Sequence, residues 1–398
     1  MDEKALITLE FPKVLDRLAQ HTAFAVSRGM ALAARPQTDL AAIKDLLAET
    51  AEARELIEEE PKLSIGGARD VREALDDAER GQVLTAGDLL DVKATLVAAR
   101  TMQRRFAEIE AQSPRLAAIA AGMPQPGGLV DAITKAIGNK GEILDSASER
   151  LGSIRSQLSV THDRLLDKMN KLLTSAGLSR HLQEPIITQR EGRYVLPIKA
   201  ESRGKVKAVV HDQSSSGATL FVEPLSVVDL NNEWRELQLA ERDEEHRILK
   251  ELSAQVGEQA ADVDAAMEGL ARLDFAFARA RYAIELGASE IDLREMRPAK
   301  EGRHPGLVLR LFGARHPLLD PDTVVPLDVD LHPQNYCLVI TGPNTGGKTV
   351  TLKTVGLMAL MAQSGLQAPV AAGSQLSVFG AIYADIGDEQ SIEQSLST

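Results

Sequence analysis

Residues 342–349 read Gly-Pro-Asn-Thr-Gly-Gly-Lys-Thr, a complete G-x-x-x-x-G-K-T phosphate loop. Such a loop needs a strand before it and a helix after it, and the flanking sequence predicts both. Residues 336–340 form a short apolar run typical of a buried parallel strand, and residues 350–361 repeat apolar side chains at helical spacing. Motif and context together predict a nucleoside triphosphate site, in preference to a glycine-rich turn with an exposed lysine.

Each part of this loop has an expected role in binding ATP. Backbone N–H groups would surround the β-phosphate, where the positive end of the following helix dipole also points. Lys348 would reach the β- and γ-phosphates, and the Thr349 hydroxyl would coordinate the Mg²⁺ that accompanies ATP. The predicted ATP-binding residues are Gly342, Pro343, Asn344, Thr345, Gly346, Gly347, Lys348 and Thr349.

Composition limits the class of protein. A length of 398 residues favours two or three domains, and no uncharged apolar run approaches the ~18 residues that span a bilayer. The N-terminus lacks the basic stretch and apolar core of a secretion signal, and a single cysteine, Cys337, excludes a disulfide framework. We therefore expect a soluble protein of the reducing cytoplasm with no membrane partner, and Cys337 as a small buried hydrophobe.

Charge distribution points to one local polyanion site. The net charge of −13 argues against indiscriminate binding of polyanions, but residues 190–207 hold six cations against two carboxylates, a local charge of +4. Aromatic residues make up only 3% of the chain, which disfavours a stacking platform for single strands and favours contact with duplex phosphates. The predicted nucleic-acid-binding residues are Arg190, Arg193, Lys199, Arg203, Lys205 and Lys207.

Most of the remaining sequence predicts helices. Residues 1–110 are mainly amphipathic, with one apolar stripe formed by Leu9, Phe11, Val14, Leu15 and Leu18. From Leu144 to Leu172 apolar residues follow alternating steps of three and four, interrupted by Thr161, which predicts a helix over about 142–175. This helix could project as an arm or pack inside an ordinary bundle, because both need such a stripe.

A small β module follows that helix. Residues 193–198, 206–210 and 218–222 are runs rich in β-branched and aromatic residues, which predict a small antiparallel sheet. Helical spacing then returns from Leu225 to about Leu293. The basic residues therefore fall on a β module between an outgoing and a returning helix.

The acidic residues near the C-terminus leave two interpretations open. Residues 379–384 form an apolar run that ends at Asp385, with Asp388 and Glu389 after it. On spacing, Asp385 could be the acidic Mg²⁺ partner at the end of a second strand, or it could end a strand that leads into another nucleotide-contacting loop. No catalytic residue is assigned.

Several motifs resemble the ATPase of MutS proteins. They are the phosphate loop, the preceding Gly313-Ala314-Arg315-His316-Pro317-Leu318-Leu319 segment and the closing Asp385-Ile386-Gly387-Asp388-Glu389-Gln390-Ser391-Ile392-Glu393-Gln394-Ser395-Leu396-Ser397-Thr398 segment. The opening Leu9-Glu10-Phe11 and the stretch from His211-Asp212 to Glu223-Pro224 resemble the second bacterial MutS branch, which is linked to recombination control and ribosome rescue. The resemblance covers the whole chain.

The resemblance implies a homodimer with composite ATPase sites, in which paired lever arms and clamps close around nucleic acid. ATP would bind the phosphate loop in cis, while Ser395 and Ser397 would lie in the signature segment that touches the γ-phosphate held by the partner subunit. Asp385 and Asp388 would precede that signature. The implied ligands are branched or structured DNA and ribosomal RNA. The implied roles are to suppress homologous recombination and to split stalled, collided ribosomes.

The resemblance also implies the fold class and the domains. The sequence ends before the acidic metal-binding strand, the later catalytic histidine region and the Smr-type nuclease domain of this branch. We therefore expect a fragment that binds ATP with little or no hydrolysis and lacks endonuclease activity. The expected fold is multidomain α plus α/β, with a mainly helical core and lever arms, a small antiparallel β clamp and a partial P-loop (ABC-like) ATPase domain. The expected domains are 1–140 helical core and lever, 141–182 outgoing lever helix, 183–224 basic β clamp, 225–298 returning lever helices and 299–398 N-terminal part of the ATPase.

Other P-loop classes fit the sequence less well. A chromosome-structuring coiled-coil ATPase would carry its phosphate loop near the N-terminus, whereas more than three hundred residues precede it here. A metabolic P-loop kinase would not need a heptad helix and a basic sheet. A mismatch-repair MutS stays an alternative within the family.

Overall fold

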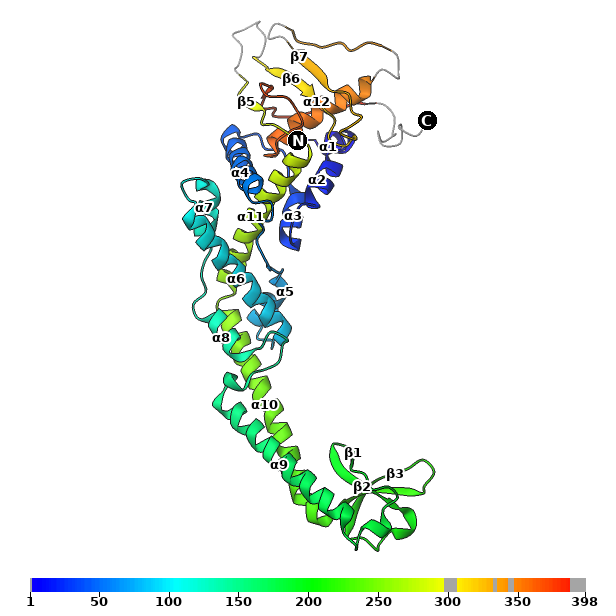
Figure 1. The fold of residues 1–398 in the computed structure, drawn as a ribbon. Coiled ribbons are helices and arrows are strands. Elements are labelled where there is room, and N and C mark those ends of the chain that lie inside the picture. The colour runs from blue at the N-terminus through cyan, green and yellow to red at the C-terminus, as the bar shows by residue number, and fades with distance from the viewer. Residues whose placement is uncertain (1, 297–305, 332–334, 343–346, 387–398) are drawn as a thin grey trace. The chain divides into compact units, whose positions relative to one another are not determined.

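The computed structural model describes residues 2–296, 306–331, 335–342 and 347–386 (Figure 1). These residues are mainly helical and include two small sheets, so the expectation of a mostly helical protein with a small antiparallel sheet is confirmed. The chain divides into two compact units: unit 1 is Met1–Glu73, Ala94–Pro126 and Ala261–Thr398, and unit 2 is Ala74–Lys93 and Gly127–Ala260. Within the described ranges no helix has both the length and the apolar character needed to cross a membrane.

Unit 1 combines helices from both ends of the chain with a mixed sheet. Its helices are α1 (Glu3–Thr8), α2 (Phe11–Ala19), α3 (Ala25–Ala33), α4 (Leu40–Glu59), α7 (Pro114–Ala121), α11 (Ala260–Glu285) and α12 (Lys348–Gln363), while α6 (Ala86–Glu108) belongs to both units. Its strands are β5 (Asp292–Arg294), β6 (Leu309–Ala314), β7 (Leu327–Leu331) and β8 (Gln375–Ser377), in the order β5-β8-β6-β7. Strand β5 runs parallel to β8, and the other pairs are antiparallel.

The core of unit 1 joins α12 to the N-terminal helices. The predicted apolar stripe of residues 9–18 is buried as expected, and it belongs to the same cluster as residues 357–362 of α12. Each fully buried leucine or phenylalanine side chain contributes roughly 1.5–3 kcal/mol. The helix that follows the phosphate loop is therefore held in place by the first helices of the chain.

Two predicted strands in unit 1 are wrong. Residues 336–340 form no strand, and Tyr336 and Val339 are 68% and 76% exposed. Cys337 is also exposed and is not the buried hydrophobe that we expected. Residues 379–384 likewise form no strand, and Tyr383 is 81% exposed. A strand needs a neighbouring strand that completes its backbone hydrogen bonds, and neither run pairs with a strand in the described part of the chain.

Unit 2 consists of helices and an antiparallel sheet. Its helices are α5 (Arg72–Glu79), α8 (Leu129–Ala136), α9 (Glu149–Thr174) and α10 (Val228–Glu258), with 3₁₀ turns η1 (Asp145–Ala147), η2 (Ser179–His181), η3 (Ala200–Ser202) and η4 (Leu225–Val227). Its strands are β1 (Thr188–Arg190), β2 (Arg193–Lys199), β3 (Ala208–Gln213) and β4 (Thr219–Pro224), in the order β1-β2-β4-β3. The three predicted strands form with small shifts in their ends, while the short β1 was not predicted.

The heptad helix starts later than its apolar spacing predicts. Ser148 has extended backbone, and its hydroxyl caps the helix by accepting a hydrogen bond from the Leu151 N–H at 3.0 Å. Helix α9 therefore begins at Glu149, and Leu144 and Ala147 precede it. From Leu151 onward the seam is confirmed, because residues 151, 154, 161, 165 and 169 are buried. Helix α9 packs along α10 (Figure 1).

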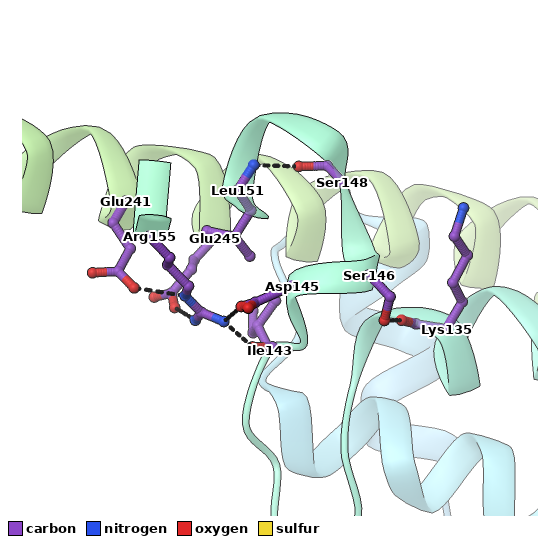
Figure 2. A network of polar contacts seen from close by, with 9 residues as sticks. All are labelled: Lys135, Ile143, Asp145, Ser146, Ser148, Leu151, Arg155, Glu241 and Glu245. Atoms are coloured by element: carbon purple, nitrogen blue, oxygen red, sulfur yellow. Dashed lines mark hydrogen bonds and ion pairs between the residues drawn. The ribbon is translucent and has the colours of Figure 1, made fainter. Parts of the chain in front are cut away.

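Arg155 of α9 joins this helix pair to the turn before it (Figure 2). Its guanidinium donates to Glu241 at 2.7 Å and Glu245 at 2.8 Å, both on α10, and to Asp145 of η1 at 2.6 Å. A fourth bond reaches the Ile143 carbonyl at 2.7 Å. Burial lowers the pKa of Arg155, but the hydrogen bonds to the three carboxylates outweigh burial and raise the pKa above its usual value. The pairing of α9 with α10 is therefore ionic as well as apolar.

Candidate nucleotide and nucleic-acid sites

The first turn of α12 is the candidate phosphate site. Gly342 has a φ of 146° and Gly347 a φ of 75°, which side-chain-bearing residues rarely adopt. Gly347 is the N-cap of α12 and, being glycine, has no side chain with which to cap the helix. The N–H groups of the first turn can therefore receive an anion. Lys348 donates to the Gly342 carbonyl, so its amino group lies between the two described ends of the loop.

This donor set fits ATP with Mg²⁺. Backbone N–H groups and an ammonium suit phosphate oxygens, and the exposed Thr349 hydroxyl suits a hard cation. The structure brings Gly342, Gly347, Lys348 and Thr349 together at one end of α12. The other predicted residues lie outside the described ranges: Pro343, Asn344, Thr345, Gly346, Asp388, Ser395 and Ser397.

Asp385 lies beside α12 in an apolar surrounding. It borders an open pocket of about 400 Å³, whose walls include Leu352 and Val355 of α12 and Phe379 of the following segment. Neither Lys348 nor Thr349 lines this pocket. The exposed Asp385 therefore borders this pocket without the predicted metal ligand Thr349.

A buried ion pair on α12 was missed by the sequence analysis. Lys353 lies 2.9 Å from Glu10, and the two side chains are 8% and 10% exposed. Burial raises the pKa of Glu10, but hydrogen bonds from Lys353 and Lys13 outweigh burial and lower the pKa below its ordinary value. No local pattern could predict this pair, because its members are 343 positions apart.

His316, the histidine of the 313–319 segment, is buried and makes a local structural contact. His316 is 2% exposed, its Nδ1 accepts the Leu318 N–H at 3.3 Å, and its Nε2 has no hydrogen-bond partner in the described residues. Burial lowers the pKa of His316 to about 4, which favours the neutral ring. Arg17 of α2 donates to the Pro317 and Leu318 carbonyls at 2.9 and 3.0 Å. These contacts attach the segment to the N-terminal helices.

The candidate nucleic-acid residues divide into two groups. Arg203, Lys205 and Lys207 are exposed on the turn that leads from η3 into β3, and Lys199 is half-buried at the end of β2. Across the described part of the chain these four side chains make no hydrogen bond or ion pair. Their charges are therefore available to phosphates.

Arg190 and Arg193 are engaged inside the module. Arg190 forms an ion pair with Asp212 at 3.1 Å, and its guanidinium stacks 4.0 Å from the centre of the Phe221 ring. Arg193 forms an ion pair with Glu223 at 3.0 Å and donates to Asn232 at 2.6 Å. Both arginines are therefore already bound to side chains of unit 2, unlike the four cations above.

Glu223 is the centre of a buried polar network. Its side chain is 2% exposed and accepts from Arg193, from His211 at 2.6 Å and from Asn231 at 2.7 Å. Asn231 also donates to the Tyr194 carbonyl and accepts the Tyr194 N–H, both at 3.1 Å. This network connects β2, β3 and β4 to the start of α10. It therefore holds in place the sheet next to the turn that carries the exposed cations.

Comparisons with known proteins agree with the resemblance seen in the sequence. A model of the family "MutS domain V" matches residues 338–398. The chain is 46% identical to the endonuclease MutS2 of Thermomicrobium roseum, 45% to that of Pelotomaculum thermopropionicum and 44% to that of Geobacillus thermodenitrificans. Each alignment covers 100% of this chain and 50%, 49% and 50% of the respective relative. The chain spans about half the length of these curated relatives. The resemblance to MutS proteins that the sequence predicted is confirmed.

Proposed function

Because this chain is a relative of the MutS2 proteins along its whole length, we propose that it is the ATP-binding and nucleic-acid-binding part of a dimeric MutS-type clamp. The observation that carries the proposal is the start of α12, where a glycine is the N-cap and Lys348 and Thr349 are the first two helical residues. ATP would bind there, in unit 1. Nucleic-acid phosphates would contact the exposed cations of unit 2.

The residues of α12 would each take one part of the nucleotide. The first-turn N–H groups would bind phosphate oxygens, the Lys348 ammonium would neutralise their charge, and the Thr349 hydroxyl would hold Mg²⁺ in position. ATP, when bound, supplies the binding free energy that shifts a dimer between open and closed clamps. Gly347 contributes the left-handed backbone that starts the helix at the phosphates.

Arg203, Lys205 and Lys207 would hold nucleic acid through its backbone. Such contacts fix position and carry no base sequence, so the ligand would be selected by shape. We propose branched DNA or structured ribosomal RNA, with suppression of recombination or separation of stalled ribosomes as the outcome. The longer relatives are named endonucleases, and the function proposed for this chain includes no nuclease activity.

Calorimetry with ATP and Mg²⁺ tests the nucleotide site. The unsubstituted chain should bind, and Lys348→Ala should weaken binding about a hundredfold, because a charge-assisted contact to phosphate is lost. Lys44→Ala, an exposed position of α4, is the matched control and should bind normally. Unchanged affinity in Lys348→Ala would contradict the assignment.

A salt series tests the nucleic-acid surface. Fluorescence anisotropy with a DNA four-way junction and a ribosomal RNA stem-loop should show affinity falling with salt, and Lys205→Ala combined with Lys207→Ala should reduce the slope by about 1.8 for the DNA. The matched control, Lys44→Ala with Lys62→Ala, removes the same charge from exposed positions of unit 1 and should leave the slope unchanged. A flat salt response of the unsubstituted chain would overturn this half of the proposal.

A further inference from the structure

The turn between α1 and α2 contacts α12 in two different ways. A Cβ atom added at Gly356 would lie 2.7 Å from both Leu9 Cδ atoms, so any larger residue there would force the buried Leu9 side chain to shift. One helical turn earlier, the Lys353 ammonium lies 2.9 Å from the Glu10 carboxylate. Positions three apart share a helix face, so an apolar and an ionic contact fix the same face of α12.

The backbone of Glu10 is adapted to this contact. Glu10 has a φ of 60° and a ψ of 26°, the left-handed region that non-glycine residues rarely adopt. It directly precedes α2, whose Phe11 is 1% exposed in the core that α12 shares. The ion pair between Glu10 and Lys353 is buried and is made from a disfavoured backbone conformation. It therefore differs from a surface salt bridge, which solvent would screen.

The C-terminal end of α12 is held by a separate set of contacts. The Gln363 amide nitrogen donates to the Gln37 carbonyl at 2.7 Å and to the Phe379 carbonyl at 3.0 Å, and its oxygen accepts the Phe379 N–H at 2.9 Å. Lys353 instead lies four residues after Thr349, about 6 Å along the axis. The ion pair with Glu10 is therefore an anchor of the half of α12 that carries the phosphate-binding turn.

We propose that Glu10 and Lys353 are positioning residues for the nucleotide site. Their ion pair holds the first turns of α12 in register, so that the backbone N–H groups, Lys348 and Thr349 converge on the phosphates. Neither side chain touches ATP in this proposal, and both act through the helix. The inference rests on the proposed function, because it assumes that ATP binds at the start of α12.

Three variants of the complete 398-residue chain test this role. Glu10→Gln and Lys353→Met each remove one charge at similar volume, and Glu10→Lys combined with Lys353→Glu exchanges the charges. Each single variant should bind ATP about tenfold more weakly in calorimetry. Glu10→Gln leaves the buried Lys353 ammonium without this counterion, and Lys353→Met leaves Glu10 paired with Lys13 alone, which does not hold α12. Amide hydrogen exchange of the nucleotide-free chain should accelerate about tenfold at residues 351–353, whose N–H groups are the first of α12 that can bond within the helix, while residues 357–363 keep their protection. The exchanged pair should restore at least half of both losses, expressed as free energies.

Glu52→Gln is the matched control. Glu52 is a buried carboxylate of α4 that accepts the N–H groups of Arg115 and Leu116 at the start of α7, and it makes no described contact with α12. This variant should lower the melting temperature without changing ATP affinity or exchange at residues 351–353.

The outcomes separate the two proposals. If Glu10→Gln and Lys353→Met leave both ATP affinity and exchange unchanged, the positioning role is overturned and the ATP site stands. If they accelerate exchange evenly along α12, their role is only structural and the inference fails. If the unsubstituted chain binds no ATP, the proposed function fails, while local acceleration at residues 351–353 still supports the anchoring of this turn.

Discussion

Replacing Glu223 by glutamine should loosen the β module of unit 2 from α10. The Glu223 carboxylate is 2% exposed and accepts from Arg193, His211 and Asn231 at 3.0, 2.6 and 2.7 Å. Glutamine keeps the size and one acceptor oxygen, but it brings an NH₂ group toward donors and leaves the Arg193 charge without a counterion.

The magnitude follows from this burial. Breaking a buried ion pair by removal of one partner costs about 3–5 kcal/mol. Because the Arg193 side chain is 27% exposed and can regain water, we expect the lower end, about 3 kcal/mol. That loss is large beside the ~5–15 kcal/mol that holds a typical domain folded.

Urea unfolding followed by tryptophan fluorescence measures this change. Trp234 is the only tryptophan of the chain, it is 7% exposed, and it belongs to the apolar cluster under the sheet. Asp212→Asn is the control, because the Asp212 and Arg190 side chains are 46% and 37% exposed and their pair contributes about 0–1 kcal/mol. A Glu223→Gln variant with the stability of the unsubstituted chain would refute the role assigned to the network.

Three further predictions test other parts of the structure. Gly257→Ala should destabilise unit 2 by about 1–3 kcal/mol, because its Cβ would lie 2.7 Å from the Ala78 carbonyl oxygen; Gly29→Ala, with nothing within 4 Å, should be neutral or stabilising in the same melts. Hydrogen bonds from Arg247 and from the Ser148 hydroxyl lower the pKa of Glu244 from its ordinary 4.5 to about 2, and they outweigh burial, which raises it. The contribution of the Glu244 carboxylate to stability is therefore complete above pH 4.5 and is lost as pH falls toward 2. In urea titrations, the stability difference between Glu244→Gln and the unsubstituted chain should shrink over that range. A constant difference would argue against the pairing. Burial sets the pKa of His316 at about 4, so stability should fall as pH drops from 6.5 to 4, and NMR titration of its ring should show a midpoint near 4, whereas a midpoint near 6.5 would mean that the ring is solvated.

The helices, including the one that follows the phosphate loop, could be predicted because their signals are local. The stripe of residues 9–18 and the seam from Leu151 each repeat within a few residues, so spacing alone identifies the buried face. The apolar run after the phosphate loop predicted helix α12, although residues 357–363 of that helix are all buried and show no single buried face. The three predicted strands of unit 2 were also found from a local signal, their short runs of β-branched and aromatic residues. Charge counting likewise found the basic residues of the module, because that count needs no fold.

Pairing between distant residues was decided by the tertiary structure. Strands at 336–340 and 379–384 were predicted from apolar runs, but a strand exists only where another strand completes its hydrogen bonds. Sequence could not separate the engaged Arg190 and Arg193 from the exposed Arg203, Lys205 and Lys207, since the carboxylates Asp212 and Glu223 reach them only across the folded sheet.

Local patterns thus identified most of the helices and the segment where positive charge collects, and they predict a phosphate site at residues 342–349. The tertiary structure decided which cations are available, and it joined Glu10 to Lys353 across 343 positions. The physical reason is that periodicity and capping act within one or two turns, whereas burial and ion pairing depend on the residues that the fold brings together.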